Sequence, residues 1–480
     1  MDQREAPLVA ALAAYREREL LPFHTPGHKQ GRAAPPPLDT LWGPGLWQMD
    51  LTEVPGLDDL HTPRGAIKRA QELAARAFGA EETFFLVNGS SAGVMAMLGA
   101  VCNPGDEIIL PRNCHRSVTA GLVLSGAVPV YLAPAVLPPF GIPLGIRAEE
   151  VEEALEKHPR AKAVLVVTPS YYGICSDLAP IAAAAHSRGI PLLVDGAHGP
   201  HLGFHPDLPE AALAAGADLV VHSTHKVLTS LTQSSLLHRQ GGRIDRERLA
   251  HMLRLVQTSS PSYLLMASLD ACRRQLALRG RELLDGLLGL AQEVRERIGT
   301  LPGLQLLDPE DLPRGFALDP TRLTVNVQGA GFSGPEAAAF LAEQGVQPEM
   351  ADPANVVFIM TVADDTTTAE GLTRALAALA AARKPPREGR QVLEALPLPP
   401  LRLPPREAVF APRERVPLAR AQNRIAGEAL IPYPPGIPLL NPGEEITLEV
   451  LAAFAEMRAA GVEFQGLADP EGAEIAVLKL

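Results

Sequence analysis

The sequence predicts an α/β protein: a large domain with a mostly parallel sheet, a smaller α+β domain and a C-terminal α+β module. Two observations lead to this prediction. Short apolar runs alternate with segments of helical period from about residue 64 to residue 222, which is the pattern of buried parallel strands and their covering helices. In addition, a chain of 480 residues is too long for one hydrophobic core.

The large domain accounts for the alternating pattern. The first 50 residues precede it and predict an arm with one short helix, because Pro and Gly interrupt the chain after that helix. Strands are predicted at residues 83–87, 107–111, 163–167, 191–195 and 218–222, and helices at residues 64–78, 91–101, 178–187 and 208–215.

A second α/β pattern follows a helical stretch at about residues 243–300. It predicts strands at 322–327 and 355–360 and helices at 334–344 and 368–383, and the last module predicts a helix at 448–460 and a final strand. A segment rich in Pro and charge predicts a linker. The expected divisions are an arm (1–50), a large cofactor-binding domain (51–290), a small domain (291–383), the linker (384–406) and a C-terminal domain (407–480).

Composition excludes several classes of function. With 43 basic and 55 acidic residues, the net charge of −12 disfavours nucleic acid as a partner. The four cysteines form no CxxC pair, so neither a metal site nor a disulfide framework is expected, and a reducing cytoplasm is. The N-terminus is charged and predicts no signal peptide. Residues 117–146 carry no charge, but five prolines make a membrane span improbable.

The segment ADLVVHSTHK, residues 217–226, is the most informative one. It predicts a strand that leads through small hydroxyls and two histidines to Lys226. A lysine at the carboxyl edge of a sheet can be held unprotonated and attack a carbonyl. Ser223 and His225 could contact a phosphate on the same ligand. The alternative is a strand end followed by a solvated lysine.

Two further segments carry chemistry. In PLLVDGAHG, residues 191–199, Asp195 ends an apolar strand, where a carboxylate can pair with a cation such as a pyridinium nitrogen. The alternative is an Asp that caps the next helix. In VNGSSAG, residues 87–93, small residues open a helix and let backbone N–H groups approach a phosphate. The alternative there is an ordinary N-cap turn.

The order of phosphate loop, strand-end Asp and lysine is that of the large domain of fold-type-I pyridoxal-phosphate enzymes. The chain also resembles the short form of the bacterial ornithine/lysine/arginine decarboxylases, from residue 22 to residue 444. The segments that carry the resemblance include PFHTPGHKQG (22–31), LTEVPGLDDLHTPRGAI (51–67), NGSSAG (88–93), PRNCHRS (111–117), TPSYYG (168–173), VDGAHG (194–199), HSTHKVLTSLTQSS (222–235), TSSPSYLLMASLD (258–270), QPEMAD (347–352) and IPYPPGIPLLNPGE (431–444).

This resemblance implies roles for single residues. Lys226 would carry pyridoxal 5'-phosphate as a Schiff base, Asp195 would pair with the pyridine nitrogen, and His115 would stack on the ring. The phosphate-binding positions would be Ser90, Ser91, Ser223 and His225. His198 stands near the ring, where larger family members have a tryptophan.

The resemblance also reaches the edges of the site. Glu349 and Asp352 are expected to be substrate carboxylates, although a strand start is the alternative for them. In relatives, the segment that holds Thr258, Ser259 and Ser260 can reach the phosphate of a neighbouring subunit. His24, His28 and His61 either belong to the site or only bond to loops.

The implied function is decarboxylation of a basic amino acid in polyamine biosynthesis, with arginine favoured over lysine or ornithine. Lys226 or His225 would return a proton to Cα. A homodimer or a dimer of dimers is expected, because the chain lacks the receiver-like domain of the larger enzymes. The alternatives are another fold-type-I activity such as an aminotransferase, with Arg322 as a carboxylate-binding candidate, and a non-catalytic regulator.

Overall fold

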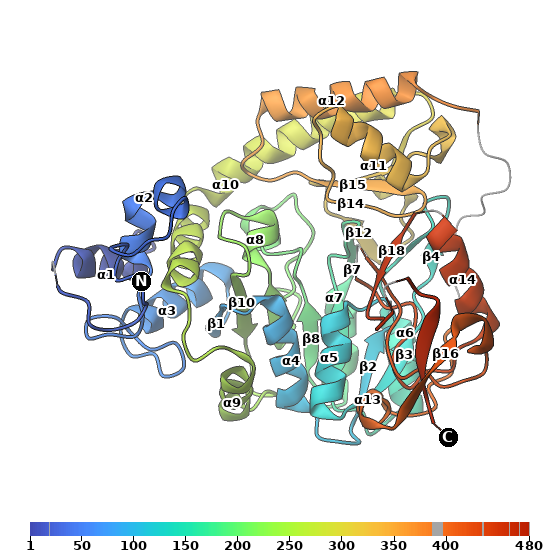
Figure 1. The fold of residues 1–480 in the computed structure, drawn as a ribbon, viewed down its shortest axis with the longest axis horizontal. Helices are drawn as coiled ribbons and strands as arrows, with labels where there is room; N and C mark the ends of the chain where they lie inside the picture. The colour runs from blue at the N-terminus through green and yellow to red at the C-terminus, as the bar shows by residue number, and fades with distance from the viewer. Residues whose placement is uncertain (19, 386–396, 434–435, 460, 470, 480) are drawn as a thin grey trace.

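The computed structural model describes residues 1–480 apart from 19, 386–396, 434–435, 460, 470 and 480. A seven-stranded sheet in the order β1-β10-β9-β8-β6-β2-β3 forms its centre (Figure 1). The pairs from β9 to β3 are parallel, and β10 is antiparallel to both neighbours, so the predicted fold class is confirmed. The strands are β1 (Glu82–Leu86), β2 (Glu107–Pro111), β3 (Val128–Leu132), β6 (Val164–Val167), β8 (Leu192–Asp195), β9 (Leu219–His222) and β10 (Ser235–Arg239).

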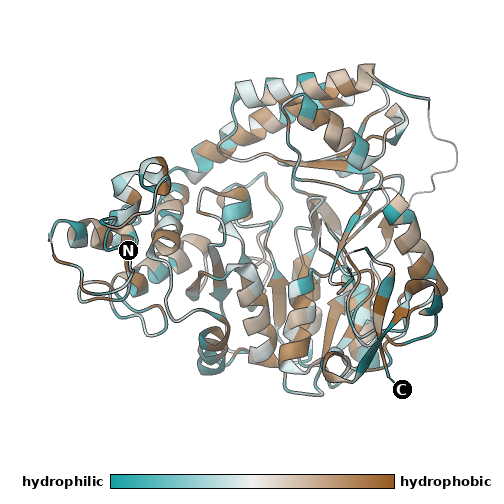
Figure 2. Cartoon of the chain, viewed as in Figure 1, coloured by the Kyte–Doolittle hydropathy of each residue, from teal (hydrophilic) through white to brown (hydrophobic). Residues whose placement is uncertain are grey.

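Helices cover both faces of this sheet. Leu193 of β8 packs into one hydrophobic cluster with α4, α5 and α9, whereas Leu192 and Val194 pack into another with α6 and α7. Successive side chains of a strand point to opposite faces, so a strand covered on both sides is apolar throughout, and Figure 2 shows the central strands in brown. The covering helices are α4 (Gly89–Val101), α5 (Arg116–Ser125), α6 (Ala148–Lys157), α7 (Leu178–Ser187) and α9 (Arg246–Val256).

The N-terminal region holds two helices rather than the one predicted. The first is α1 (Pro7–Arg16), and the second is α2 (Leu38–Met49). The second was missed because Gly43 and Pro44 interrupt its helical pattern. The structure accommodates both by a kink, with Gly43 at φ 68°.

Asp58 fixes the start of α3 (Ala66–Phe78), the first helix of the large domain. Its carboxylate accepts hydrogen bonds from the backbone N–H groups of Gly65, Ile67 and Lys68. These groups have no partner within the helix, and an anion there also suits the helix dipole. The predicted helix at residues 64–78 is therefore present, and it begins two residues later.

A single long helix, α10 (Tyr263–Gly299), joins the large domain to the small one. Its 37 residues make it about 55 Å long at 1.5 Å per residue. It passes the expected domain boundary at residue 290 without a break. Figure 1 shows it running from the N-terminal helices to the upper layer of the molecule.

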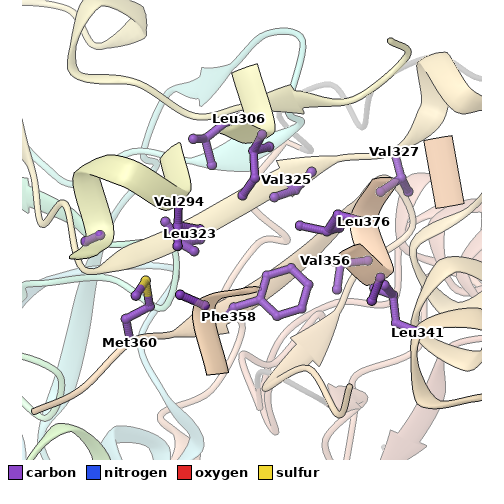
Figure 3. Close-up of a cluster of buried hydrophobic side chains, with 14 of the residues drawn as sticks. Val294, Leu306, Leu323, Val325, Val327, Leu341, Val356, Phe358, Met360 and Leu376 are labelled. Atoms are coloured by element: carbon purple, nitrogen blue, oxygen red, sulfur yellow. The ribbon is translucent and has the colours of Figure 1, made fainter. Parts of the chain in front are cut away.

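The small domain is a four-stranded antiparallel sheet in the order β11-β13-β15-β14, covered by helices. Its core lies between the sheet and the helices, where Val325, Val356 and Leu376 pack together (Figure 3). The predicted strands and helices are confirmed within a few residues. The elements are β11 (Gln305–Leu306), β13 (Arg322–Asn326), α11 (Gly334–Glu343), β14 (Met350–Ala351), β15 (Asn355–Ile359) and α12 (Thr366–Ala381).

The C-terminal module packs beside the large domain. A buried ion pair joins the two, with Arg112 Nη2 2.8 Å from Glu444 Oε2. The predicted helix and final strand are present, whereas residues 386–396 of the predicted linker lie outside the described residues. The elements are α13 (Pro405–Phe410), β16 (Arg413–Pro417), β17 (Ile431–Tyr433), α14 (Leu448–Ala459), β18 (Glu463–Gln465) and β19 (Glu474–Leu478).

The helix predicted at residues 208–215 is wrong. The chain forms turns there, with one helical hydrogen bond from Ala215 N–H to the carbonyl of Ala211. Pro209 has no N–H to donate, and Gly216 adopts φ +97°, so little room for a helix remains between them.

Short hairpins complete the chain. Residues 117–146, the uncharged stretch, form α5, β3 and a small hairpin rather than one helix. Among the described residues, no helix has the length and apolarity needed to cross a membrane. The remaining strands are β4 (Val136–Leu137), β5 (Ile142–Pro143), β7 (Ile174–Ser176) and β12 (Phe316–Leu318).

Candidate active site

The carboxyl edge of the central sheet holds the chemistry-bearing residues. Asp195 is the last residue of β8, and Lys226 lies in the one-turn helix α8 (Thr224–Val227) that follows β9. Because β8 and β9 are parallel, their carboxyl ends lie at the same edge. Both side chains therefore reach one pocket. The sequence-predicted residues that line it are Ser90, His115, Asp195, His198 and Lys226.

Lys226 lies in a setting that favours its neutral form. Burial lowers the pKa of its ammonium group, and the charges of Asp195 and Glu349 only partly oppose this shift. Its Nζ lies 3.1 Å from Nε2 of His198 and 5.1 Å from the centre of the Tyr171 ring. A neutral amine is the form that attacks a carbonyl. The geometry thus favours a nucleophile over a solvated lysine.

Asp195 faces the same pocket and is 5% exposed. Burial raises its pKa, while the charge of Lys226 and a hydrogen bond from Ala197 N–H at 3.2 Å lower it. Residues 196–199 form a turn, so Asp195 caps no helix. A carboxylate in this position would stabilise a cationic ring nitrogen.

His115 forms one wall of the pocket. It is the N-cap of α5, and its Nδ1 accepts a hydrogen bond from Ser117 N–H. Burial, followed by the charges of Lys226 and Arg116, lowers its pKa to about 4. Gly436 lies behind the ring, where an added Cβ would stand 3.3 Å from Cδ2 of His115. The result is a neutral flat ring suited to cover a planar ligand.

The first turn of α4 is the candidate anion-binding end. Gly89 adopts φ +74° and its N–H donates to the carbonyl of Gln233 at 2.9 Å, while Asn88 makes no side-chain capping bond to the N–H groups that follow. Ser223 Oγ donates to Ser90 Oγ at 2.8 Å. Ser90 lines the pocket, whereas Ser91 and Ser223 stand beside it. These hydroxyls and amides are the donors that a phosphate needs.

His225 bonds to the backbone of a neighbouring loop. Its Nδ1 lies 2.8 Å from the carbonyl oxygen of Ser234 and donates to it. Burial lowers its pKa, and it does not line the pocket. His225 is therefore poorly placed to reach a reacting carbon, and a contact with a phosphate remains a prediction.

The two expected substrate carboxylates have different surroundings. Asp352 accepts hydrogen bonds from the N–H groups of Ala354 and Asn355 at 2.8 Å and from Asn355 Nδ2, so it holds the turn before β15. Asp352 thus has a structural role between β14 and β15, and its contact with a substrate stays a prediction. Glu349 is exposed, and its charge acts on Lys226. Glu349 therefore remains the candidate for a cationic side chain.

The other histidines bond to the arm and to loops. His24 Nε2 lies 2.9 Å from Tyr15 Oη, and His28 Nε2 lies 3.1 Å from Asp50. His61 Nε2 lies 2.8 Å from the carbonyl oxygen of Thr258. None of the three lines the pocket. Next to Thr258, Ser259 and Ser260 are exposed.

Arg322 lies behind His198 rather than in the pocket. Its guanidinium is buried, and Nη2 donates to Nδ1 of His198 at 3.1 Å. Gly173 makes this possible, because a Cβ at that position would stand 2.6 Å from Cβ of Arg322. Arg322 therefore does not line the pocket in which it was expected to bind a substrate carboxylate.

Sequence reasoning assigned no role to Tyr171 and Ile437, which also line the pocket. Tyr171 follows the end of β6 by four residues, as Lys226 follows β9 and His115 follows β2. The same strand-end pattern could have identified it. Ile437 comes from the C-terminal module, and no local pattern marks it.

Pyridoxal phosphate fits the residues of this pocket. Lys226, whose pKa burial lowers, and the carboxyl group of Asp195 face the same space, the flat neutral ring of His115 lines it, and the first turn of α4 with the Ser90 hydroxyl offers hydrogen-bond donors at one end. Among the described residues, no group of three His, Cys, Asp or Glu side chains is arranged to hold a metal ion.

Comparison with known proteins gives the same assignment. The family model for the major domain of Orn/Lys/Arg decarboxylases matches residues 6–314, and that for their C-terminal domain matches residues 402–474. The chain is 40% identical over 484 residues to arginine decarboxylase of Bacillus subtilis, covering 100% of this chain and 99% of that relative. It is 27% identical to the lysine decarboxylase of Pseudomonas aeruginosa, covering 92% of this chain and 74% of that relative.

A solved structure has the same fold. Lysine decarboxylase A from Pseudomonas aeruginosa superposes with a TM-score of 0.84, covering 98% of this chain and 80% of that chain, at 23% identity. The fold thus extends over the large domain, the small domain and the C-terminal module alike.

Proposed function

Because the chain belongs to the Orn/Lys/Arg decarboxylase family, we propose that it decarboxylates arginine and binds its cofactor through Lys226. The activity of the family is pyridoxal-phosphate-dependent decarboxylation of a basic amino acid, and the chain is a carboxy-lyase. The observation that supports the site assignment is that Lys226, whose pKa burial lowers, and the buried Asp195 line the same pocket.

Each end of the pocket has its own task. Bound pyridoxal phosphate supplies a cationic ring that accepts electrons from the bond between Cα and the leaving carboxylate. Asp195 would hold a proton on the ring nitrogen, and His115 would lie against the ring. Ser90, Ser223 and the first turn of α4 would bind the phosphate. Lys226 would hold the cofactor through its side-chain nitrogen.

Lys226 is also our candidate for returning a proton to Cα. It lines the pocket, whereas His225 does not and donates its Nδ1 proton to Ser234. A general acid must come within hydrogen-bond reach of the reacting atom. His225 is left to contact the phosphate.

Arginine is favoured by two arguments. Full-length relatives that are 40% identical to this chain are named arginine decarboxylases, whereas a relative named lysine decarboxylase is 27% identical. Glu349 is exposed near Lys226, and one carboxylate can accept two parallel hydrogen bonds from a guanidinium. An ammonium makes no such paired contact.

Two measurements test this proposal. Release of CO2 from arginine, lysine and ornithine under equal conditions should be fastest from arginine, and faster turnover of lysine or ornithine would refute the substrate while leaving the family intact. Borohydride reduction followed by peptide mapping should find the cofactor on Lys226. A label on Lys29 or Lys68 would refute the site assignment, and no turnover of any of the three would favour a regulator.

We further propose that the enzyme works in the cytoplasm as a homodimer or a dimer of dimers with shared sites. Ser259 and Ser260 are exposed beside Asn88 of the phosphate loop, to which Thr258 N–H donates at 3.2 Å. The four cysteines are free and buried, which suits a reducing compartment. Sedimentation analysis should give a dimer or tetramer. A monomer with full activity would contradict the shared site.

A further inference from the structure

Arg322 is a buried cation whose guanidinium is mostly without hydrogen-bond partners. It is 1% exposed, and among the described residues its Nε and Nη1 have no partner. Only Nη2 is bonded, to Nδ1 of His198. Burying an arginine in this way is costly, because its N–H groups lose their water without replacement. Such an arrangement calls for a functional explanation.

The carboxylate of Asp319 is the charge that most strongly raises the pKa of Arg322, and it also lies against His201 and Thr321. Asp319 Oδ2 lies 3.1 Å from His201 Nε2, and Asp319 Oδ1 accepts hydrogen bonds from the backbone and hydroxyl of Thr321. Arg322 therefore directs its one good hydrogen bond toward the pocket. Because it does not line the pocket itself, it acts on the site through the imidazole in front of it.

The chain of contacts from Arg322 to Lys226 fixes where the protons lie. A guanidinium has donors only, so Nδ1 of His198 must be unprotonated to accept from it. The neutral imidazole then carries its proton on Nε2. That nitrogen is 3.1 Å from Lys226 Nζ, which must accept the hydrogen bond. An amine can accept only when it is neutral.

The charges around Lys226 agree with this arrangement. Asp195 from β8 and Glu349 before β14 raise its pKa, whereas burial and the charge of Arg322 from β13 lower it. Four other titratable side chains face Lys226, and burial lowers the pKa of the first of them. They are His198, His115, Tyr171 and His225.

We propose that Arg322 is a positioning residue that acts through His198 to favour the unprotonated form of the Lys226 nitrogen, both as the free amine and when it is bonded to the cofactor. This inference rests on the proposed role of Lys226 as the cofactor lysine. It assigns a purpose to a buried arginine that does not line the pocket.

The test is a pH titration of the visible spectrum of the holoenzyme. That spectrum changes when the Lys226 nitrogen gains or loses a proton. Removing the cation in Arg322→Gln should raise the midpoint by about one pH unit, a tenfold change in the protonation equilibrium. The matched control is Arg273→Gln, which removes an equally buried guanidinium of α10 and should leave the midpoint unchanged. An unchanged midpoint in Arg322→Gln would overturn the proposal.

A double variant tests the route through the imidazole. In the background of His198→Phe, Arg322→Gln should shift the midpoint by less than half of its effect in the wild type. A full shift in both backgrounds would mean that the charge acts directly, and this would overturn the role of His198. Should Arg322→Gln not fold, the 15N shifts of His198 in the wild type decide: an unprotonated Nδ1 supports the proposal, and a protonated Nδ1 overturns it.

Lys226→Ala separates this inference from the proposed function. It should lose the pH-dependent visible spectrum altogether. If Lys226→Ala retained that spectrum, the cofactor would be held elsewhere and the proposed function would fail. A spectrum that depends on Lys226 but not on Arg322 would reject only the inference drawn here.

Discussion

The two sides of the pocket are built in different ways. On the large-domain side, Asp195 ends its strand, and His115, Tyr171 and Lys226 each follow theirs by four residues. On the small-domain side, Arg322 of β13 lies behind His198, and Glu349 before β14 acts on Lys226 through its charge. The first side is fixed by local chain geometry, since parallel strands end at one edge. The second depends on how two domains pack, so its residues carry no local signature.

The largest expected effect lies on the large-domain side. Lys226→Ala should lower kcat by several orders of magnitude, because it removes the amine that binds the cofactor and carries the proton. Steady-state turnover of arginine measures this. Lys68→Ala, a change on the outer face of α3, should keep turnover near that of the wild type. Equal losses of kcat in Lys226→Ala and Lys68→Ala would contradict a special role for Lys226.

Asp195 gives the next effect. Asp195→Asn should stay folded and lose most of its turnover, because a ring nitrogen without a carboxylate partner is a weaker electron acceptor. Asp218 is the matched control: it is 2% exposed, precedes β9 at the opposite edge of the sheet, and bonds Leu192 N–H. Asp218→Asn should lower the melting temperature with little effect on kcat. Loss of turnover in Asp218→Asn with normal turnover in Asp195→Asn would contradict the assignment of Asp195 to the site.

The small-domain side should give a smaller, substrate-specific effect. Glu349→Gln should weaken the use of arginine relative to the neutral analogue citrulline by about 1.5–3 kcal/mol, the value of a charged hydrogen bond. Competition between the two compounds measures the difference. Asp352→Asn should instead lower stability, since its carboxylate holds a turn. Normal arginine kinetics in Glu349→Gln would refute that assignment.

The smallest effect concerns pH. Burial, and then His201, lowers the pKa of His222 in the folded protein to about 3 from 6.5. Between these two pH values the His222 imidazole is protonated in the unfolded chain but not in the folded protein. The free energy of unfolding is therefore unaffected by this residue above about pH 6.5 and decreases as the pH falls toward 3. His222→Phe should flatten this loss by up to about 1.4 kcal/mol per pH unit. Urea unfolding at about pH 6 and pH 4 would show it, and an unchanged slope would contradict it.

The sequence predicted the large-domain half of the fold well because its signals are local. Buried strands read as apolar runs, and Asp195 and Lys226 stand at their ends. The helix predicted at 208–215 is absent. Its apolar pattern is helical, but Pro209 has no N–H to donate at one end and Gly216 adopts a positive φ at the other. The place of Ile437 in the pocket and the contact of Arg322 with His198 could not be foreseen, since both arise from packing between segments far apart in sequence. Residues at strand ends can thus be predicted from local sequence, whereas residues brought together by contacts between distant segments cannot.

The C-terminal module has a consequence for the order in which the enzyme is made. Ile437 lines the pocket, Gly436 backs His115, and Glu444 pairs with Arg112. During synthesis the reactive lysine emerges long before the segment that covers it. We expect a nascent or truncated chain that stops before residue 430 to be inactive, so only finished molecules would consume the amino acid. Assaying a chain that ends at residue 400 would test this, and full activity would refute it.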